Sequence, residues 1–554
     1  MRLIIVGGVA GGASCAARAR RLSETAEIVI FERGDHVSFA NCGLPYYIGG
    51  DITERNRLLV QTAEGLRRRF NIDVRTRTEV LEIDRKTRHV VVRAADGAEH
   101  REPYDRLLLA PGADPLRPPI PGIADPRILT LRNLQDTDRI KNLVDAGARR
   151  ALVVGGGYVG LEMVEALRHR GLEVTIVEMA DQIMPPLDAE MAELLLRELK
   201  GNAVTVHLGN AVKSFAAAPT GVTATLADGT TAEADLVLVG IGVRPEVRLA
   251  KEAGLELGST GGIKVDDHMR TSDPDIFAAG DAVEVTDLVT EQPALVPLAG
   301  PANRQGRIAA DNLCGRDSSY KGTQGTAIVK LFSLAAGMTG ANEKTLRRTK
   351  RKFEKVYLHP DSHAGYYPGG APIAMKVLFD PDDGRLLGAQ AVGHDGIDKR
   401  IDVLATALRA GMTVYDLEEL ELCYAPPFGS AKDPVNMAGF IAANVLCGGN
   451  RLVQPETVAA RSEPEALVLD VRSREEYDTG HVENAMLIPV DELRDRLDEL
   501  PRDKVIHAYC KVGLRAYLAQ RILSENGFDA RNLTGGFTTY AAVKAVLDRG
   551  NESR

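Results

Sequence analysis

The sequence predicts an α/β protein of several domains, and three observations lead to this expectation. Two stretches of chain, about 150 residues apart, each contain an apolar strand, a glycine-rich turn, a helix and a second strand. Strands that alternate with helices are typical of parallel sheets covered on both faces. A third region, beyond residue 456, is long enough to form a compact α/β unit of its own. A length of 554 residues accommodates roughly three to five domains.

Composition and charge exclude several classes of protein. Hydrophobic residues make up 44% of the chain and charged residues 26%, which is ordinary for a soluble globular protein. The net charge of −9 gives no overall basic field for a nucleic acid or an anionic membrane. The opening MRLIIVGG passes from a short apolar run directly into glycines, as a buried strand does, and no long apolar run follows. We expect a cytoplasmic protein without nucleic-acid or membrane partners.

The six cysteines are scattered, and no two of them have the CxxC spacing of a metal or disulfide site. We therefore predict neither a disulfide framework nor a bound metal. In a reducing compartment a lone cysteine is either structural or reactive. Cys42 and Cys510 are predicted to be reactive. The cysteines interpreted as packing residues are Cys15, Cys314, Cys423 and Cys447.

The second glycine motif, at residues 155–160, matches G-x-G-x-x-G in full and lies between an expected strand at 150–154 and an expected helix at 161–170. The glycines allow a tight turn, close approach of a pyrophosphate and close helix packing, and the helix N-terminus attracts phosphate. Glu178 follows the next expected strand, at 173–177, where a carboxylate accepts ribose hydroxyls and repels a 2′-phosphate. NADH is thus expected in preference to NADPH. The residues expected to bind it are Gly155, Gly157, Tyr158, Val159, Gly160 and Glu178.

The first glycine motif, at residues 7–12, departs from the pattern because Val9 replaces the middle glycine. Glu32 again follows the second strand, and Gly280-Asp281 offers a carboxylate to a ribityl or ribose chain. The pair of motifs suggests FAD at the first site and NADH at the second. Further elements are expected as strands at 2–7, 27–31, 107–113 and 235–242 and a helix at 13–22, and residues 273–281 are expected to end a strand with a Gly-Asp turn. The residues expected at the FAD site are Gly7, Val9, Ala10, Gly11, Gly12, Glu32, Arg33, Asn41, Ala110, Gly112, Gly280 and Asp281.

Cys42 stands in a polar stretch whose place in chain order puts it near the isoalloxazine end of an FAD. A dithiol reductase with CxxxxC spacing needs a second cysteine at position 47, but Tyr47 stands there. Cys42 is therefore predicted to act alone. A single thiolate could attack a disulfide or persulfide and hold half of the substrate as a mixed disulfide. It could equally cycle through sulfenic acid during reduction of peroxide or oxygen.

Basic side chains gather near this cysteine. Ser14, Arg18 and Arg21 lie on one face of the expected first helix, and residues 67–69 add three consecutive arginines. Guanidinium groups suit phosphates. The two clusters beside a reactive cysteine therefore suggest a phosphate-bearing thiol such as coenzyme A.

These motifs resemble the coenzyme A-disulfide reductase branch of the pyridine nucleotide–disulfide oxidoreductases. The resemblance covers about residues 1–445, and its carriers are GGVAGG at 7–12, SFANCGLPY at 38–46, GGGYVG at 155–160, FAAGD at 277–281, HAGYYPG at 363–369 and CYAPPFGSAKDPVNMAG at 423–439. It implies FAD, a single redox cysteine at Cys42, and a homodimer with a C-terminal dimerisation region.

The resemblance also implies roles for individual side chains. Tyr424 and either Tyr366 or Tyr367 would lie over the site from the partner subunit. Phe70 stands where some relatives carry a lysine for the substrate, and Arg69 is the expected substitute. The residues implied to contact coenzyme A are Ser14, Arg18, Arg21, Ser38, Asn41, Arg69, Asn303 and Lys432.

The C-terminal unit resembles rhodanese. It contains DVR at 470–472, GH at 480–481 and the loop CKVGLR at 510–515, between an expected strand at 504–509 and an expected helix at 514–526. In that family, a cysteine in a six-residue loop that ends in arginine cradles a persulfide. Loop N–H groups, the helix dipole and Arg515 would favour the thiolate and stabilise anionic sulfur. Cys510 is thereby implied to accept or donate sulfane sulfur.

The expected fold class is α/β, with two Rossmann-like dinucleotide-binding domains, an α+β dimerisation domain and a C-terminal rhodanese-like α/β domain. The expected boundaries are 1–112 and 244–322 for FAD binding, 113–243 for NAD(P)H binding, 323–447 for dimerisation, 448–456 for a linker and 457–554 for the rhodanese-like domain.

The expected activity is NADH-dependent reduction of coenzyme A persulfide, polysulfide and coenzyme A disulfide. Catalysis would involve Cys42 and Cys510, with Arg515 beside Cys510 and Tyr366 or Tyr424 helping to protonate the leaving group. The pantetheine arm could carry sulfur between the two cysteines. The alternatives are an NADH oxidase or peroxidase that uses a Cys42 sulfenate, a sulfurtransferase with a secondary flavin part, and a redox-sensing interaction module.

Overall fold

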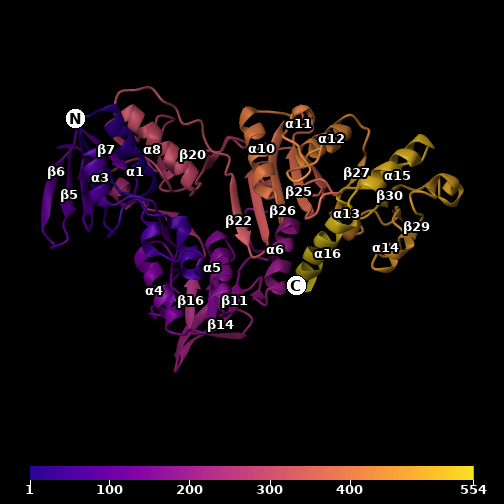
Figure 1. The fold of residues 1–554 in the computed structure, drawn as a ribbon, viewed down its shortest axis with the longest axis horizontal. Coiled ribbons are helices and arrows are strands. Elements are labelled where there is room, and N and C mark those ends of the chain that lie inside the picture. The colour runs from indigo at the N-terminus through magenta and orange to yellow at the C-terminus, as the bar shows by residue number, and fades with distance from the viewer. Residues whose placement is uncertain (553–554) are drawn as a thin grey trace. The chain divides into compact units, whose positions relative to one another are not determined.

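The structure is a computed structural model that describes residues 1–552, and the chain forms two compact units. The first unit contains residues 1–177 and 210–325, and the second contains 178–209 and the chain from 326 onward. Figure 1 identifies the elements of both units by label and colour. Within the described residues, no helix combines the length and the apolar character of a membrane span.

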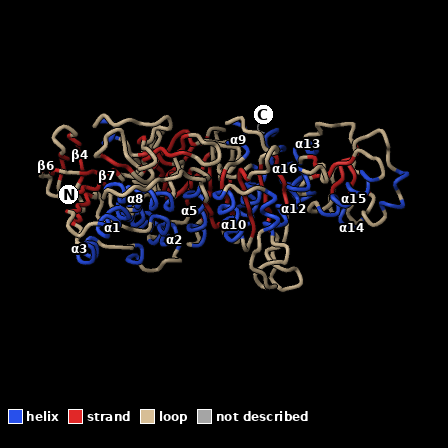
Figure 2. The backbone as a smooth tube through the Cα atoms, turned by 90° about the horizontal axis from the view of Figure 1, so that it is seen from above, coloured by secondary structure: helices blue, strands red, loops and turns tan. Residues whose placement is uncertain are grey.

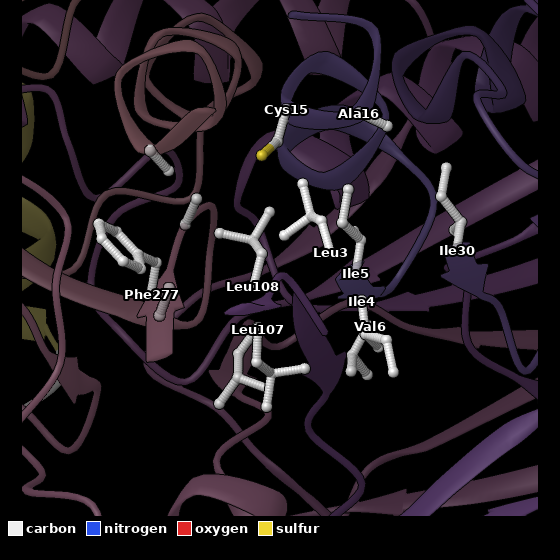
Figure 3. Close-up of a cluster of buried hydrophobic side chains, with 14 of the residues drawn as sticks. Leu3, Ile4, Ile5, Val6, Cys15, Ala16, Ile30, Leu107, Leu108 and Phe277 are labelled. Atoms are coloured by element: carbon white, nitrogen blue, oxygen red, sulfur yellow. The ribbon is translucent and has the colours of Figure 1, made fainter. Parts of the chain in front are cut away.

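The first unit is built around a five-stranded parallel sheet with the order β19-β7-β1-β2-β3. Its strands are β1 (Arg2–Val6), β2 (Glu27–Phe31), β3 (Asp73–Arg75), β7 (Arg106–Leu109) and β19 (Ile276–Ala278). In Figure 3, Leu3, Ile5 and Leu108 point toward the helix that carries Cys15. Ile4, Val6 and Leu107 point to the opposite face (Figure 3). Both faces of the sheet are therefore buried, which explains why these strands are continuous apolar runs rather than alternating ones.

Helices α1 (Ala10–Leu22) and α8 (Ala299–Leu313) lie side by side, as Figure 2 shows. The contact requires glycine, because a Cβ on Gly306 would lie only 2.2 Å from the carbonyl oxygen of Gly11. At the end of α1, the buried Arg20 donates hydrogen bonds to five backbone carbonyls, including those of Phe70 and Asn71. This arginine thus fixes α1 against the end of helix α3 (Ala63–Phe70).

A second parallel sheet contains β11-β10-β16-β9 in that order. Its strands are β9 (Ile128–Leu129), β10 (Arg150–Val154), β11 (Glu173–Val177) and β16 (Leu236–Val239), with helices α4 (Leu134–Asp145) and α5 (Tyr158–His169). The chain passes between the two sheets at β8 (Ala113–Pro115) and β17 (Val243–Pro245), which pair antiparallel.

Strands β2, β10 and β11 have the predicted bounds, but the helices that follow the glycine turns begin earlier than expected. Helix α1 starts at Ala10 instead of Ala13, and α5 starts at Tyr158 instead of Leu161. The reason is that the last residues of each glycine motif already form the first helical turn. Helix propensity disfavours glycine, so propensity alone places these helix starts too late.

Smaller elements complete the first unit. Two antiparallel three-stranded sheets are β4-β5-β6 and β13-β14-β15. The bounds are β4 (Glu79–Asp84), β5 (His89–Arg93), β6 (Glu99–Pro103), β13 (Val212–Ala218), β14 (Gly221–Leu226), β15 (Thr231–Ala234), β18 (Ile263–Lys264), β20 (Val283–Thr286), β21 (Pro293–Ala294), η1 (Asn41–Gly43), α2 (Leu44–Gly49), η2 (Arg55–Leu58) and α7 (Arg248–Glu252).

The second unit contains a five-stranded antiparallel sheet with the order β22-β23-β26-β25-β24. Helix α10 packs on its strands β23 and β26, as Figure 1 shows. The bounds are α6 (Ala189–Gly201), β12 (Thr205–His207), β22 (Ala327–Leu331), β23 (Leu334–Gly340), α9 (Glu343–Arg348), β24 (Glu354–Leu358), β25 (Ile373–Phe379), β26 (Leu386–Gly393), α10 (Ile397–Ala410), α11 (Val414–Glu419) and α12 (Pro434–Leu446).

A buried group of charges lies behind this sheet. The ammonium of Lys376 on β25 is fully buried and donates to Asp188 at 2.8 Å, to Glu190 at 2.6 Å and to Glu343. Lys355 on β24 adds a second ammonium, 2.7 Å from Glu343. The three carboxylates lie close enough to one another to hold a metal ion, but Lys376 occupies the centre of the group. These charges join α6, α9 and the antiparallel sheet.

The C-terminal part of the second unit is a parallel sheet with the order β27-β31-β30-β28-β29. The bounds are β27 (Leu452–Val453), α13 (Pro455–Ala459), β28 (Leu467–Asp470), α14 (Arg474–Asp478), β29 (Met486–Leu487), η3 (Leu493–Asp495), η4 (Leu497–Glu499), β30 (Ile506–Tyr509), α15 (Leu514–Glu525), β31 (Ala530–Leu533) and α16 (Gly536–Glu552). The stretch 448–456, which we expected to be a linker, instead provides the edge strand β27 and the start of α13. Its glycines lie before the strand, and the pairing of β27 with β31 is a long-range contact that the local sequence does not reveal.

Candidate active site

The first glycine turn and the ends of the parallel strands β1, β2 and β7 enclose a cavity, which is where nucleotides bind in parallel α/β sheets. The predicted residues that line it are Gly7, Val9, Ala10, Gly11, Glu32, Arg33, Asn41, Ala110, Gly112, Gly280 and Asp281. Gly12 is the one predicted FAD-site residue that does not line the cavity, and it instead allows the start of α1 to pack closely against Gly7. A Cβ on Gly12 would lie only 1.9 Å from the carbonyl oxygen of Gly7.

The donors and acceptors around this cavity fit a flavin dinucleotide. Glu32 accepts hydrogen bonds from the N–H groups of Gly8 at 2.9 Å and Gly34 at 2.8 Å, which hold its carboxylate at the end of β2. Gly7 adopts a left-handed φ of 94°, and a Cβ there would lie 2.2 Å from the carbonyl oxygen of Ala110. Only glycine therefore permits this approach between β1 and β7.

Arg132 is a cavity residue that the sequence analysis missed. It lies in the loop before α4, lines the cavity and forms an ion pair with Asp114. Burial lowers the pKa of Arg132, and the charge of Arg33 contributes to the shift. Asp281 on the other side is also half-buried, and desolvation raises the pKa of its carboxyl. Arg132 has no glycine motif beside it, so its role becomes visible only when the loop is seen against the cavity.

Cys42 lies in the turn η1, directly before the short helix α2, and its side chain is exposed. The chain reaches this turn through Ser38, which has a φ of 47° and whose N–H donates to the carbonyl of Gly8 at 2.8 Å. This bond attaches the cysteine loop to the first glycine turn. Tyr47, at the position of a second cysteine, is part of α2, and the ammonium of Lys141 lies over its ring, 5.3 Å from the ring centre.

Two acidic residues influence the thiol of Cys42. Although the residue is exposed to solvent, neighbouring protein atoms partly desolvate the thiol and raise its pKa, and the charges of Glu162 and Asp281 raise it further. Glu162 stands on α5, which packs against α2. Burial, with the charge of Glu165, raises the pKa of Glu162 to about 7. Glu162 lies beyond the glycine motif and has no motif of its own, because its effect on Cys42 depends on the packing of α5 against α2.

The second glycine turn has the geometry that a pyrophosphate requires. Gly155 has a φ of 108°, and a Cβ there would lie 2.4 Å from the carbonyl oxygen of Gly240. A Cβ on Gly160 would lie 2.0 Å from the carbonyl oxygen of Gly155. Gly157 is the N-cap of α5 and has open space where its Cβ would be, so a phosphate could approach the helix N-terminus. Tyr158 is half-buried and Val159 is exposed at the same turn.

Glu178 directly follows β11. Its N–H donates to the carbonyl of His207 at 2.8 Å, and its carboxylate accepts from the N–H of Ala180 at 2.8 Å. The carboxylate is thus held at the end of the strand, in the position in chain order that the motif predicts.

The residues predicted to bind coenzyme A differ in their surroundings. Ser14 donates a hydrogen bond to Asn303, which joins α1 to α8 at this point. Arg18 forms an ion pair with Asp311 at 2.7 Å, so part of its charge is already compensated within the protein. Arg21 and Arg69 are exposed. The structure therefore leaves Arg21 and Arg69 as the more accessible guanidinium groups of the predicted set.

In the second unit, the phenol groups of Tyr366 and Tyr424 are joined by a hydrogen bond of 2.7 Å. Tyr367 instead packs edge-on against His363, with ring centres 5.6 Å apart. Of the adjacent tyrosines, Tyr366 is thus the one paired with Tyr424. Lys432 is exposed on the same loop region, before the N-cap of α12.

Cys510 follows β30 and precedes α15, as predicted. The N–H of Gly513 donates to the Cys510 sulfur at 3.1 Å, and the carbonyl of Cys510 accepts from Phe537 at 2.7 Å. Arg515, the last residue of the loop, forms two hydrogen bonds of 2.7 Å with Glu476. Glu476 lies on α14, and the sequence analysis did not identify it.

Comparison with known proteins agrees with this arrangement. Residues 1–302 match the family of pyridine nucleotide-disulphide oxidoreductases, residues 326–434 match the dimerisation domain of that family, and residues 454–542 match the rhodanese-like domain. A coenzyme A disulfide reductase of Staphylococcus haemolyticus is 37% identical over 447 residues, which cover 80% of this chain and all of the relative.

Solved structures extend the similarity to the C-terminal domain. The reduced CoADR-RHD of Bacillus anthracis is 48% identical, with a TM-score of 0.96 over 99% of this chain and 98% of the other. A NAD-dependent persulfide reductase from A. fulgidus is 38% identical, with a TM-score of 0.92 over 97% of this chain and all of the other. A water-forming NADH oxidase from Lactobacillus brevis is 29% identical, with a TM-score of 0.78 over 81% of this chain and 99% of the other. The chain belongs to the pyridine nucleotide–disulphide oxidoreductases, as an FAD- and NAD(P)H-dependent disulfide or persulfide reductase that resembles coenzyme A disulfide reductases and carries a C-terminal rhodanese-like domain.

Proposed function

We propose that the protein uses NADH to reduce coenzyme A persulfide, polysulfide and coenzyme A disulfide through Cys42, and that Cys510 handles sulfane sulfur. The observation that carries this proposal is the exposed cysteine Cys42 on a loop attached to the first glycine turn, with Tyr47 at the position where a second, resolving cysteine would stand. The names of the coenzyme A disulfide reductase and the persulfide reductase relatives support the same substrate class.

The sulfur chemistry needs one protein thiol. The Cys42 thiolate attacks one sulfur of the substrate S–S bond, that bond breaks, and the other sulfur leaves as coenzyme A thiolate or hydrosulfide. A bound flavin supplies the transfer of two electrons from NADH to sulfur. With those two electrons and one proton, the bond between Cys42 and the bound sulfur would be cleaved, and the Cys42 thiolate and the second thiol product would form. The phenols of Tyr366 and Tyr424, joined by a hydrogen bond of 2.7 Å, are the proposed proton donor, because a protonated phenol can donate to a leaving thiolate.

The adenine nucleotide end of coenzyme A is assigned to the basic side chains near α1 and α3. Arg21 and Arg69 provide exposed guanidinium groups, and Ser14 with Asn303 provides neutral polar groups. Arginine forks recognise phosphates through two hydrogen bonds. Exchanging Arg21 and Arg69 for glutamine should raise KM for coenzyme A substrates and leave KM for inorganic polysulfide unchanged.

Three structural assignments belong to the same proposal. Glu178 favours NADH over NADPH because its carboxylate repels a 2′-phosphate. The dimerisation domain at 326–434 assembles a homodimer, in which Tyr366 and Tyr424 act on the partner's Cys42. The FAD-binding domain comprises 1–112 with 244–322, and the NAD(P)H-binding domain comprises 113–243. A kcat/KM that is higher with NADPH than with NADH would contradict the assignment for Glu178.

Steady-state assays of NADH oxidation with coenzyme A persulfide, polysulfide and coenzyme A disulfide test the function directly. We expect all three to be reduced by the wild type and none by Cys42→Ser. The Cys510→Ser variant should keep reduction of coenzyme A disulfide, which contains no sulfane sulfur. Loss of coenzyme A disulfide reduction in Cys510→Ser, or its survival in Cys42→Ser, would contradict the separate roles proposed for the two cysteines.

A second candidate is an NADH oxidase or peroxidase, which the similarity to the Lactobacillus brevis NADH oxidase favours. In that case Cys42 would be oxidised to a sulfenate and then reduced. Stopped-flow mixing of reduced enzyme with hydrogen peroxide or with coenzyme A persulfide separates the two functions. We expect the persulfide to reoxidise the reduced enzyme faster than peroxide does. If peroxide is faster, the oxidase or peroxidase function is favoured.

A further inference from the structure

The Cys510 loop is organised before any substrate binds. The thiol is 1% exposed and accepts an N–H from Gly513, which has a φ of 112° at the N-cap of α15. The backbone of the loop is fixed from outside by residues of α16, since Phe537 donates to the carbonyl of Cys510 at 2.7 Å and Thr538 to that of Lys511 at 3.0 Å. The loop therefore has a defined shape, and its charges stand in defined positions.

The arginine that ends this loop is already paired. Its two terminal nitrogens donate to the two carboxylate oxygens of Glu476, each at 2.7 Å, and the same guanidinium interacts with the Cys510 thiol. The Arg515 bonds lower the pKa of Glu476 to about 2, so that Glu476 is ionised at neutral pH. Glu476 is itself held at the start of α14, where it accepts from the N–H of Ser473 at 3.1 Å. The positive charge next to the thiol is therefore compensated by a fixed carboxylate, and Lys511 is the remaining cation of the loop.

Two exposed leucines follow the cysteine loop. Leu514 is 67% exposed and Leu518 is 49% exposed, and the two lie one turn apart on α15, directly after the cysteine loop. Adjacent side chains of this kind at a helix surface form a continuous apolar strip. A free inorganic anion gains nothing from such a strip, whereas an organic chain that carries the sulfur can lie on it.

We propose that the Arg515–Glu476 pair and the Leu514–Leu518 strip make Cys510 selective for sulfane sulfur carried on an organic thiol, and that Glu476 is the residue that disfavours small dianions such as thiosulfate. This proposal rests on the sulfane-sulfur role proposed above for Cys510. In the reaction, the Cys510 thiolate attacks the outer sulfur of a persulfide R–S–S⁻. The S–S bond of the donor breaks, R–S⁻ leaves, and Cys510 becomes a persulfide without net oxidation or reduction.

The physical basis is a difference in charge. Thiosulfate carries two negative charges and releases sulfite, which also carries two, so its transfer needs uncompensated positive charge near the thiol. An organic persulfide carries one charge on the reacting sulfur and releases a single thiolate. The carboxylate of Glu476 therefore opposes the dianion more strongly than the monoanion.

Glu476→Gln tests the proposal, because glutamine keeps the length of the side chain and its hydrogen bonding at the start of α14 but removes the charge. Glu475→Gln is the matched control, since Glu475 is an exposed neighbour on α14 and makes no hydrogen bond with Arg515. The full-length enzyme is mixed with thiosulfate or glutathione persulfide in the absence of NADH, and persulfide on Cys510 is followed by mass spectrometry, with Cys510→Ser as the blank.

We expect the wild type to load faster from glutathione persulfide. In Glu476→Gln, the ratio of the thiosulfate rate to the persulfide rate should rise roughly five- to tenfold, the size expected for one partly screened charge, and Glu475→Gln should keep the wild-type ratio. Replacing both Leu514 and Leu518 with serine should slow loading from coenzyme A persulfide and leave thiosulfate unaffected.

The outcomes separate this proposal from the function on which it rests. If neither donor loads Cys510 in the wild type, both the sulfane-sulfur role and the specificity assignment fail. If both donors load but the wild type prefers thiosulfate, or if Glu476→Gln and Glu475→Gln change the ratio equally, only the specificity assignment fails. The wild-type preference does not depend on how well any variant folds.

Discussion

The reactivity of Cys42 depends on carboxylates that the surrounding sequence does not contain. Glu162 reaches the neighbourhood of the thiol from α5, and Asp281 reaches it from the turn after β19. Burial raises the pKa of Cys42 and both carboxylates raise it further, so that these surroundings favour the thiol form. A thiol of this kind resists unproductive oxidation, since the thiolate is the reactive form.

Glu162→Gln should lower the pKa of Cys42, because the amide removes the carboxylate whose charge raises that pKa more than the charge of Asp281 does. The pKa of Glu162 is about 7, so this carboxyl is already ionised in the alkaline range in which the Cys42 thiol titrates. The pH dependence of Cys42 alkylation by iodoacetamide, followed by mass spectrometry, measures the shift. Glu64→Gln, an exposed change on α3, should leave the profile unchanged, and an unchanged profile in Glu162→Gln would argue against the electrostatic coupling.

Lys376→Met should destabilise the protein by about 3–5 kcal/mol, the usual cost of leaving buried charges without their partner. The variant keeps Asp188, Glu190 and Glu343 buried but removes the ammonium at their centre. Urea unfolding of the holoenzyme measures the loss. Lys352→Met removes an exposed cation 3.6 Å from Asp382 and should change stability by no more than roughly 0.5 kcal/mol. An equal loss of unfolding free energy in the two variants would show that pairing of the buried charges with Lys376 does not stabilise the protein more than a surface ion pair does.

The buried charges around Lys376 also predict how the free energy of unfolding changes in acid. The two lysines lower the pKa of Glu343 from 4.5 to about 2. A carboxyl with a lowered pKa stabilises the folded state above its ordinary pKa, and this contribution is lost as the pH falls from about 4.5 toward 2. The pH dependence of the unfolding free energy should be steeper in that range for the wild type than for Glu343→Gln. Parallel curves for the two proteins would contradict the assignment.

At the scale of elements, the two glycine turns show how close packing depends on a missing side chain. Each turn brings the start of a helix against the carbonyl of the first glycine in its motif, and the third glycine, Gly12 or Gly160, provides the space. The helix N-terminus then stands at the end of its strand, where its N–H groups can meet a phosphate.

Gly160→Ala should reduce kcat/KM for NADH at least tenfold, because the new methyl group would lie 2.0 Å from the carbonyl oxygen of Gly155 and force α5 away from the turn. Flavin content, read from the absorbance spectrum, should remain near the wild-type value, since the first turn is unchanged. Gly201→Ala, at the end of α6 with open space around its Cβ, is the control and should behave as the wild type. A normal kcat/KM in Gly160→Ala would mean that the second turn does not bind NADH.

At the scale of the whole molecule, the proposed homodimer makes a prediction that no single subunit can show. Co-expression of Cys42→Ser subunits with subunits in which Tyr366 and Tyr424 are both phenylalanine should restore about a quarter of the wild-type activity, because half of the dimers then contain one intact site. Differently tagged subunits allow the hybrid to be purified and assayed. If the tyrosines served their own subunit, the hybrid would be no more active than the average of the parents.

The sequence by itself determined the features that depend on local pattern. The apolar strands, the glycine turns and the acid at the end of β2 are readable from Gly7, Gly12 and Glu32, because backbone sterics and strand order require these residue types at fixed spacing. The absence of a resolving cysteine at Tyr47 and the loop from Cys510 to Arg515 are likewise properties of the printed sequence.

Only the tertiary structure decided which distant residues meet. Arg132 at the flavin cavity, Glu162 beside Cys42 and Glu476 on Arg515 have no motif of their own, and each acquires its role from the packing of separate elements. The strand β27 in the expected linker is a further case, since two residues form a strand only when β31 supplies their hydrogen bonds. Long-range contacts of this kind follow from the folded arrangement, and local sequence carries little information about them.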